Sequence, residues 1–547
     1  MPENVFPTLT DVQMERIAAH GRRRPIATGE VLVNVGDQDV HFFLLLSGAV
    51  QIFSVTPSGG EELIVTHHRG QFSGEANMIT GRRALARLRV SEAGEVVDLD
   101  RSQLMSMIQT DADLSAILMR AFILRRLHLI EGHFGDVIVV GSTHDSGTLR
   151  VREFLERNGH PYQYLDLDRD ADAQTILDQF HVAVDDVPVL VCRGRTVLRN
   201  PSNQKIAECL GFNDAIDREP VRDVIVVGAG PAGLAAAVYA ASEGLDVLVL
   251  ESSTPGGQAA TSTKIENYLG FPNGISGEKL MARAYAQAAK FGAQVLVAKG
   301  ARTLERAGPL FRVGIDGGET VTGRTVIIAS GAQYRRLPLS NLSKFEGAGV
   351  YYAATPMEGQ LCKDEDAIIV GGGNSAGQAA VFLADRAARH VDILVRKDGL
   401  AETMSKYLIR RIESHSKIGV KPRTEVVALD GGDHLECVRW RDNRTGAEET
   451  RRVRHLFMMT GAAPNTAWLD GSVVLNENGF VKTGPELSRE QLAAAGWRLR
   501  REPFLLETSL PGVFAVGDVR CGNVKRCASA VGEGSIAVSF VHQVLRS

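Results

Sequence analysis

The stretch from residue 223 to 251, DVIVVGAGPAGLAAAVYAASEGLDVLVLE, most constrains what this chain can fold into. An apolar run at 224–227, a helical stretch at 232–242 and a second apolar run at 247–250 follow one another in it. This order of strand, helix and strand predicts one complete βαβ unit with two parallel strands.

Four residues of this stretch have the chemistry that a bound dinucleotide requires. Gly228 permits the tight turn, and Gly230 lets backbone N–H groups approach a pyrophosphate. Gly233 allows close packing of helix on strand, and the helix N-terminus supplies partial positive charge. Glu251, about 20 residues further on, is placed to accept hydrogen bonds from a ribose hydroxyl. An ordinary Gly-rich turn is the alternative, but all parts of the unit fit, so nucleotide binding is predicted.

Length and composition favour a multidomain protein of the α/β class. With 547 residues, a hydrophobic fraction of 44% and 56 glycines, the chain suits about three or four domains rich in tight turns. Its net charge of −4 gives no electrostatic case for nucleic acid or an anionic membrane as partner. We expect a cytoplasmic protein without a membrane span, since the N-terminus lacks a signal-peptide core and arginines interrupt residues 116–130. Six cysteines without a CxxC pair or zinc-like spacing predict free thiols and no metal site.

Residues 1–132 have the pattern of a β jelly-roll. Short β-type runs punctuated by turn residues fill 26–100, with helical stretches at 11–20 and 101–129. The segment FSGEANMITGRRALA, residues 72–86, resembles the cyclic-nucleotide-binding domain family. That resemblance implies Glu75 on the ribose hydroxyl and Arg82 on a cyclic phosphate, a role that suits a guanidinium fork. A degenerate jelly-roll kept for packing or dimerisation is the alternative.

Residues 135–216 form a β-α-β-α-β-β-α series that resembles the thioredoxin/glutaredoxin fold. The series includes a helix around 173–180, and Val187-Pro188 stands where that fold has a cis-proline. The place of the family's CxxC reads STHDSGTLR, residues 142–150, and has no cysteine. Thiol exchange needs a thiolate, so we expect no redox role here.

A second fingerprint, DAIIVGGGNSAGQAAVFLADRAARHVDILVRK, begins at residue 366, and TSLPGVFAVGDVR stands near the end of the chain. Two Rossmann units in one chain, the second inserted before the first is completed, suit an enzyme that brings two dinucleotides together. We therefore predict one domain in two parts, 220–336 and 465–547, with a second domain at 337–464 inserted between them.

The 220–547 stretch resembles the thioredoxin reductase branch of the pyridine nucleotide-disulfide oxidoreductases. The resemblance rests on Gly256–Gln258, Glu266-Asn267, Gly331-Ala332 and Gly517-Asp518, which stand in the family's order. It implies FAD and NADPH as cofactors. The residues it assigns to FAD are Gly228, Gly230, Gly233, Glu251, Gly257, Gln258, Asn267, Gly331, Gly517 and Asp518. Those it assigns to NADPH are Gly371, Gly373, Asn374, Ser375, Ala376, Arg396 and Lys397, and the last two are cations that suit a 2′-phosphate rather than NADH.

The redox motif of that branch is missing. Where the family has CATC and an acid, Ala353 and Pro356 replace both cysteines and Met357 replaces the acid. Cys521 and Cys527 are the alternative relay, because Cys527 begins a predicted helix and a helix start lowers a thiol pKa. Structural or incidental cysteines are the other interpretation of this pair.

We therefore predict a homodimeric flavoenzyme in which NADPH reduces FAD, with a small molecule or a redox protein as acceptor and a cyclic nucleotide as a regulatory ligand. The alternative is a signal-responsive binding protein that uses the flavin domain as a redox-sensitive scaffold.

Overall fold

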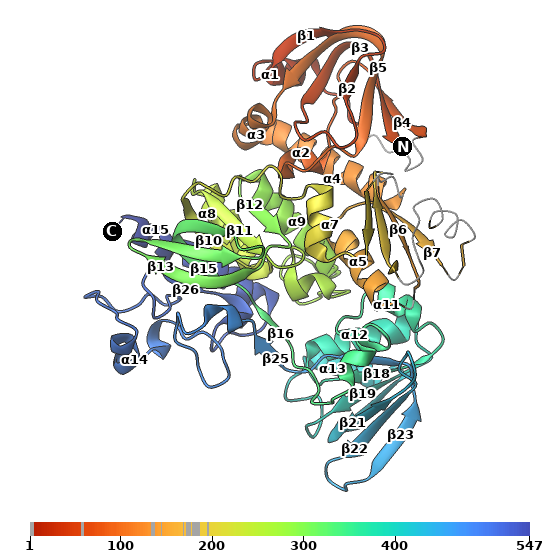
Figure 1. Cartoon of the computed structure of the whole chain (residues 1–547), viewed down its shortest axis with the longest axis vertical. Helices are drawn as coiled ribbons and strands as arrows, with labels where there is room; N and C mark the ends of the chain where they lie inside the picture. The colour runs from red at the N-terminus through yellow and green to blue at the C-terminus, as the bar shows by residue number, and fades with distance from the viewer. Residues whose placement is uncertain are drawn as a thin grey trace.

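The computed structural model describes residues 5–55, 60–132, 137–143, 145–167, 169–170, 177, 186–193 and 196–546. Figure 1 shows four units: an N-terminal β unit at the top, a four-stranded unit at the right, a first Rossmann unit in the middle and a second at the bottom. Their residue ranges are 5–132, 137–216, 222–331 with 465–546, and 335–461. Among the described residues, no helix is long and apolar enough to cross a membrane.

The N-terminal β unit is an antiparallel sheet with the strand order β1-β5-β3-β4, in which β2 also pairs with β5. Its elements are α1 (Asp11–Ala18), β1 (Arg22–Ile26), β2 (Val31–Val33), β3 (Phe42–Val55), β4 (Glu61–His67), α2 (Ala76–Thr80), β5 (Ala86–Leu99), α3 (Arg101–Thr110) and α4 (Ala112–Glu131). The helical stretch predicted at 101–129 is two helices, because extended Asp111 ends α3 and caps α4 by accepting from Leu114 N.

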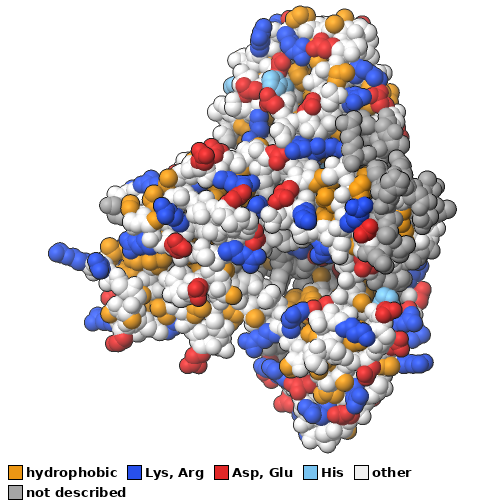
Figure 2. Space-filling model, in the orientation of Figure 1, with side chains coloured by type: hydrophobic (Ala, Val, Ile, Leu, Met, Phe, Trp, Pro, Cys, Tyr) orange, Lys and Arg blue, Asp and Glu red, His pale blue; other side chains and the backbone are white. Residues whose placement is uncertain are grey.

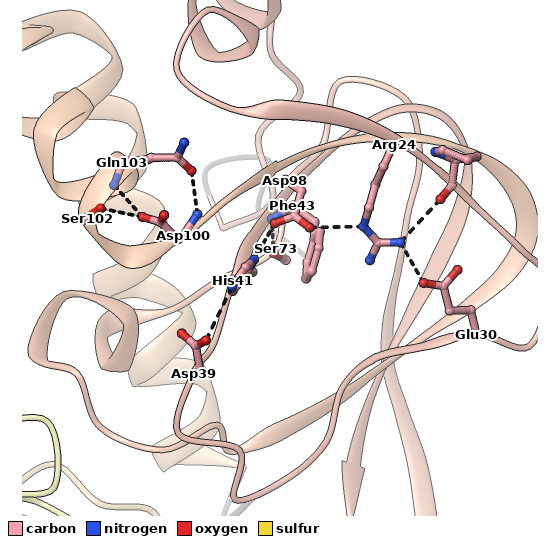
Figure 3. A network of polar contacts seen from close by, with 11 residues as sticks. Arg24, Glu30, Asp39, His41, Phe43, Ser73, Asp98, Asp100, Ser102 and Gln103 are labelled. Atoms are coloured by element: carbon pink, nitrogen blue, oxygen red, sulfur yellow. Dashed lines mark hydrogen bonds and ion pairs between the residues drawn. The ribbon is translucent and has the colours of Figure 1, made fainter.

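A polar network around Asp98 ties three strands of this sheet together (Figure 3). Asp98, on β5, accepts from Arg24 Nε of β1 at 3.1 Å, and its other oxygen lies 2.6 Å from His41 Nδ1 just before β3. Asp100 then caps α3 by accepting from Gln103 N at 2.8 Å. The network fixes the pairing of the sheet and the start of the helix that leaves it.

The four-stranded unit has the order β7-β6-β8-β9, with β6 and β7 parallel and the other pairs antiparallel. Its elements are β6 (Val137–Gly141), α5 (Ser146–Arg157), β7 (Gln163–Asp166), β8 (Val189–Cys192), β9 (Thr196–Arg199) and α7 (Asn203–Leu210). The Val187–Pro188 peptide bond is cis. The helix expected around 173–180 lies outside the described residues apart from Leu177.

The first Rossmann unit has a sheet of order β12-β11-β10-β15-β14-β13, and β26 pairs with β15. Its elements are β10 (Arg222–Val227), α8 (Pro231–Ser242), β11 (Val247–Glu251), η2 (Gly257–Thr261), α9 (Gly277–Lys290), β12 (Gln294–Val297), β13 (Ala301–Ala307), β14 (Leu310–Ile315), β15 (Thr320–Ile328), η3 (Ala467–Leu469), η4 (Gly484–Glu486), α14 (Arg489–Ala494), β26 (Val513–Ala515), η5 (Gly517–Val519) and α15 (Cys527–Arg546). The predicted βαβ unit is confirmed, since β10 and β11 are parallel and α8 connects them. The chain returns to complete this unit, because β26 joins the sheet and α15 packs on α8.

The second Rossmann unit has a parallel sheet of order β17-β24-β18-β19-β20 and a three-stranded antiparallel sheet, β21-β22-β23. Its elements are α10 (Leu342–Phe345), β17 (Val350–Tyr351), α11 (Pro356–Leu361), β18 (Asp366–Val370), α12 (Asn374–Arg386), β19 (His390–Val395), α13 (Lys406–Glu413), β20 (Ile418–Pro422), β21 (Thr424–Asp430), β22 (Cys437–Asp442), β23 (Glu448–Arg452) and β24 (His455–Met458). Two antiparallel strands, β16 (Ala332–Tyr334) and β25 (Ala462–Pro464), connect the two Rossmann units.

One hydrophobic core joins the four-stranded unit to the first Rossmann unit. Phe154 and Phe212 belong to the same buried cluster as Val226 and Ala236. The second Rossmann unit has a cluster of its own, whereas the cluster of the N-terminal β unit also includes Ala289 of α9. On the face shown in Figure 2, acidic and basic side chains are interspersed, in keeping with a net charge of −4.

Candidate functional site

The turn between β10 and α8 requires glycine at two positions for steric reasons. Gly228 has a φ of +107°, and a Cβ there would stand 2.3 Å from Ala329 O. A Cβ at Gly233 would stand 1.8 Å from Gly228 O, so α8 packs against the turn itself. These contacts bring the helix N-terminus directly over the end of the strand.

Gly230 differs from Gly228 and Gly233, because a side chain there would not clash with the protein. The absence of a side chain instead leaves open space beside the turn. The atom nearest to a Cβ there would be Gly257 Cα, at 3.9 Å. Gly230 has no side chain to cap α8, and the first N–H groups of a helix have no partner within it. A pyrophosphate fits such a helix start, since it meets free N–H groups and partial positive charge.

This turn opens on a cavity of about 830 Å³. All residues predicted for FAD except Gly233 line it, namely Gly228, Gly230, Glu251, Gly257, Gln258, Asn267, Gly331, Gly517 and Asp518. Gly233 lies beneath the turn, where its role is packing. The volume of the cavity and the meeting of several chain segments around it suit a large cofactor.

Two carboxylates, those of Glu251 and Asp518, line the cavity. Glu251 is buried and accepts from Ala229 N and Ser253 N, each at 2.9 Å, and its burial raises the pKa of its carboxyl. Burial also raises the pKa of Asp518, and Lys525 Nζ donates to the Asp518 carbonyl at 3.0 Å. The Glu251 carboxylate is therefore positioned by backbone contacts before any ligand binds.

The second Gly-rich turn repeats the geometry of the first. A Cβ at Gly371 would stand 2.1 Å from Met459 O, whereas one at Gly373 would have no described heavy atom within 4 Å. Ala376, at the position equivalent to Gly233, is fully buried. Asn374 Oδ1 accepts from Ser405 N at 2.8 Å, so the 400–405 segment is held against the start of α12.

Two residues of this second turn face the first cavity. Asn374 and Ser375 line it together with the glycines of the first Rossmann unit. Tyr334, on the connecting strand β16, also lines it and hydrogen-bonds to the Ser375 side chain, while burial raises the Tyr334 pKa. The two cradles are therefore adjacent in this structure.

Arg396 and Lys397 follow β19 at the surface. The Arg396 side chain is 77% exposed, with Nε 3.9 Å from Glu425 Oε1. Lys397 Nζ pairs with Glu402 Oε2 at 2.6 Å. Both side chains are exposed to solvent.

No residue of the segment 353–357 lines the cofactor cavity. Thr355 caps α11, with Pro356 as its first residue, and Ala354 is buried. Thr355, Pro356 and Met357 line another cavity, of about 1210 Å³, together with Arg152 of α5. The nearest cysteine along the chain is Cys362, whose burial raises the pKa of its thiol to about 12.

Cys521 and Cys527 do not have the character of a reactive pair. The prediction that a helix start lowers the Cys527 pKa is wrong: Cys527 begins α15, but its burial and then the charge of Asp518 raise the pKa of its thiol to about 11. Cys521 Sγ accepts from Asn476 Nδ2 at 3.2 Å. No disulfide joins the two cysteines, both of which the structure describes.

In the N-terminal β unit, Glu75 and Arg82 point to different places. Glu75 lines a cavity of only about 80 Å³, where Arg125, His128 and Leu129 of α4 also project, and its burial raises the pKa of its carboxyl. Arg82 does not line this cavity.

Arg82 is buried at the contact with the neighbouring unit. Its NH1 donates to Asn158 O at 3.0 Å, and its guanidinium carbon stacks 4.0 Å from the centroid of the Phe212 ring. The expected pair of ribose and phosphate contacts is therefore not assembled in this structure.

Sequence reasoning missed Tyr334 and Arg157, which also line the cofactor cavity. Arg157 is the last residue of α5, in another unit, so no local motif marks it. Within the described part of the chain, no three His, Cys, Asp or Glu residues gather as a metal site.

Comparisons with known proteins agree with this geometry. Residues 222–534 match the family Pyridine nucleotide-disulphide oxidoreductase, and residues 23–111 match the Cyclic nucleotide-binding domain. The chain is 35% identical over 319 residues to a thioredoxin reductase of Mycolicibacterium smegmatis, covering 58% of this chain and 95% of that one. It is 34% identical over 318 residues to a thioredoxin reductase of Streptomyces clavuligerus, covering 58% and 92%.

Among solved structures, the T. acidophilum thioredoxin reductase is similar, with a TM-score of 0.53 and 28% identity over 60% of this chain and 100% of that one. The family uses FAD and NADPH, and the two Gly-rich cradles fit two dinucleotides. The chain thus belongs to the pyridine nucleotide-disulphide oxidoreductase family, as a thioredoxin reductase-like, FAD-dependent NADPH oxidoreductase that also carries a cyclic nucleotide-binding domain.

Proposed function

We propose that this protein moves electrons from NADPH through FAD to an acceptor without the dithiol relay of the thioredoxin reductases. The observation that carries the proposal is the shared cavity, which Gly228, Gly230 and Asp518 line from the first Rossmann unit and Asn374 and Ser375 line from the second. Two dinucleotides held by these turns would share one cavity, and hydride transfer requires the nicotinamide and the flavin to come close together.

The residues divide the binding work between the two units. The α8 N-terminus at Gly230 holds the FAD pyrophosphate, Glu251 accepts from its ribose, and Asp518 meets the flavin side of the cavity. The α12 N-terminus at Gly373 holds the NADPH pyrophosphate, with Arg396 and Lys397 on the 2′-phosphate. When bound, NADPH supplies a hydride that FAD accepts and passes on as electrons.

The acceptor is a small molecule or a redox protein rather than a thioredoxin disulfide. Ala353 and Pro356 stand where the cysteine pair is expected, and neither side chain can form a thiolate. The thiols of Cys362 and Cys527, with pKa values of about 12 and 11, stay protonated at neutral pH. We also propose that the four-stranded unit is a glutaredoxin-like domain that lacks the CxxC pair.

Anaerobic stopped-flow mixing tests the proposal. NADPH should bleach the flavin absorbance faster than NADH, and the reduced protein should turn over small quinones or ferricyanide. A thioredoxin disulfide should be reduced at a negligible rate. A protein that stays colourless after incubation with FAD, or robust thioredoxin turnover that survives both Cys521→Ser and Cys527→Ser, would contradict it.

A second function, regulation by a cyclic nucleotide, is favoured by one contact. The short helix α2 and Arg82 pack on Phe212 and on α9, and α9 in turn packs on the η2 segment that carries Gly257. A ligand that drew the Arg82 guanidinium away from Phe212 would alter this contact.

The nucleotide needs more room than about 80 Å³, so α4 must move when it binds. Cyclic AMP and cyclic GMP should therefore change the rate of flavin reduction, and an unchanged rate at millimolar nucleotide would exclude this regulation.

A further inference from the structure

Arg157 reaches the cofactor cavity from outside the Rossmann units. It is the last residue of α5, in the four-stranded unit, yet it lines the cavity together with Gly228, Gly230 and Glu251. Its NH2 group donates to Gly257 O at 3.0 Å across the contact between the units.

This contact places the guanidinium beside the phosphate cradle. A Cβ on Gly257 would lie 3.1 Å from Gly230 Cα, so the carbonyl that Arg157 holds belongs to a residue packed on the opening of α8. The same charge lies close enough to Glu251 to oppose the rise in carboxyl pKa that burial causes. Arg157 is therefore next to the turn where a pyrophosphate is expected.

The Arg157 guanidinium has donors to spare. NH1 donates to Glu153 Oε1 at 3.0 Å and NH2 to Gly257, while the buried Nε has no hydrogen-bond partner among the described residues. A guanidinium has five N–H donors and binds phosphate oxygens with charge-assisted hydrogen bonds.

Three other cations line the cavity, namely Arg302, Lys525 and Arg526. Arg302 Nε pairs with Asp316 Oδ1 at 2.5 Å. Lys525 Nζ donates to the Asp518 carbonyl, on the side of the cavity that η5 forms. Of these four cations, Arg157 is the one whose side chain donates to a described residue packed on the Gly-rich turn, through Gly257 O.

The position of Arg157 is fixed by the packing of its unit. The four-stranded unit and the first Rossmann unit share one hydrophobic cluster, which includes Phe154 of α5. The Asn213 side chain, on the segment between the two units, accepts from Val297 N at 2.8 Å and donates to Val297 O at 2.9 Å. Because this packing already holds the segment in place, a ligand that contacts Arg157 causes a smaller further loss of conformational entropy.

We propose that Arg157 binds the pyrophosphate of FAD, so that the four-stranded unit is a structural part of the flavin site. This inference rests on the proposed placement of FAD at Gly228–Gly233. It gives a unit without redox thiols a function in cofactor retention.

The test measures FAD affinity rather than turnover. Apoprotein of the full chain is titrated with FAD and followed by flavin fluorescence, for the unmodified protein and for Arg157→Gln, Arg157→Met and Arg157→Lys. Arg150→Gln is the matched control, since Arg150 lies on the same helix but donates to Pro201 O at 2.7 Å, within its own unit. ADP, which carries the same pyrophosphate without the flavin, is titrated as a competitor.

Arg157→Gln keeps a donor for Gly257 O and should still weaken FAD and ADP binding about tenfold or more, with an unchanged apoprotein melting temperature. The FAD affinity of Arg157→Lys should lie between those of the unmodified protein and Arg157→Gln. Arg150→Gln should bind FAD like the unmodified protein. If Arg157→Gln does not fold, Arg157→Met and Arg157→Lys decide the question. If Arg157→Gln or Arg157→Met binds FAD as tightly as the unmodified protein, the role of Arg157 is overturned but the proposed function is not. If the unmodified protein does not bind FAD, the proposed function is overturned as well.

Discussion

Two alanine substitutions in one turn should separate folding from cofactor binding. In Gly233→Ala the new Cβ would stand 1.8 Å from Gly228 O, against the 3.0 Å that real contacts of this kind respect, a shortfall of 1.2 Å. The start of α8 must therefore move away from the turn. Overpacking of this kind costs about 1–3 kcal/mol, and about 2–4 °C of Tm follows each kcal/mol in a unit of this size.

In Gly230→Ala, by contrast, the nearest atom to the new Cβ is 3.9 Å away and the backbone has an ordinary φ of −74°. The apoprotein should melt at an unchanged temperature. Its methyl group, however, occupies the space left for the pyrophosphate, so FAD affinity should fall about tenfold or more, which corresponds to about 1.4 kcal/mol.

Differential scanning calorimetry of both apoproteins and FAD titration by fluorescence give the two quantities separately. Gly233→Ala should lower the apoprotein Tm by several degrees, and Gly230→Ala should lower only the affinity. An apoprotein Tm that falls as far in Gly230→Ala as in Gly233→Ala would refute the assignment of the open position to the ligand.

Three further predictions concern selectivity, thiol reactivity and pH. Replacing Arg396 and Lys397 together by Ala should weaken NADPH binding about tenfold or more while NADH binding stays the same, and equal losses in inhibition assays with the two nucleotides would refute the 2′-phosphate contact. With a pKa of about 11, the Cys527 thiol should resist iodoacetamide at pH 8 and react as pH approaches 11, which peptide mass spectrometry can follow; rapid labelling at pH 7 would contradict the burial argument. Burial, and then the charge of Arg125, lowers the pKa of His67 to about 3. Between pH 6.5, the usual histidine pKa, and pH 3, His67 is therefore protonated in the unfolded chain but neutral in the folded chain. This contribution to stability is complete above pH 6.5 and falls with pH by up to about 1.4 kcal/mol per unit, so urea unfolding should lose part of its pH dependence in His67→Gln and would keep it in full if His67 titrated normally.

The features that sequence predicted well are local in the chain. The turn at Gly228–Gly233 and the strand ending at Glu251 lie within one βαβ unit, where a few glycines set both the backbone and the space for a ligand. The same logic predicted the second turn at Gly371, and it predicted the return of the chain at residues 513–518 because an apolar strand there ends in Gly-Asp.

The features that sequence did not predict depend on contacts between distant segments. Arg82 has a phosphate-binding context in sequence, but its partners are Asn158 and Phe212, which no local pattern relates to it. Arg157 ends an unremarkable amphipathic helix, and its contact with Gly257 arises only from the packing of two units. For Cys527 the helix start was correct, but burial outweighs its effect on the thiol pKa.

The most direct test of the central claim is the number of electrons that the holoprotein takes up. Anaerobic titration with dithionite, followed by flavin absorbance, compares the reducing equivalents consumed with the bound FAD. A protein whose flavin is its redox centre consumes about two electrons per FAD, whereas a flavin in exchange with a disulfide consumes about four. We predict about two electrons per FAD for this protein, unchanged in Cys521→Ser and Cys527→Ser. An uptake of about four that falls to two in either variant would contradict the absence of a thiol relay.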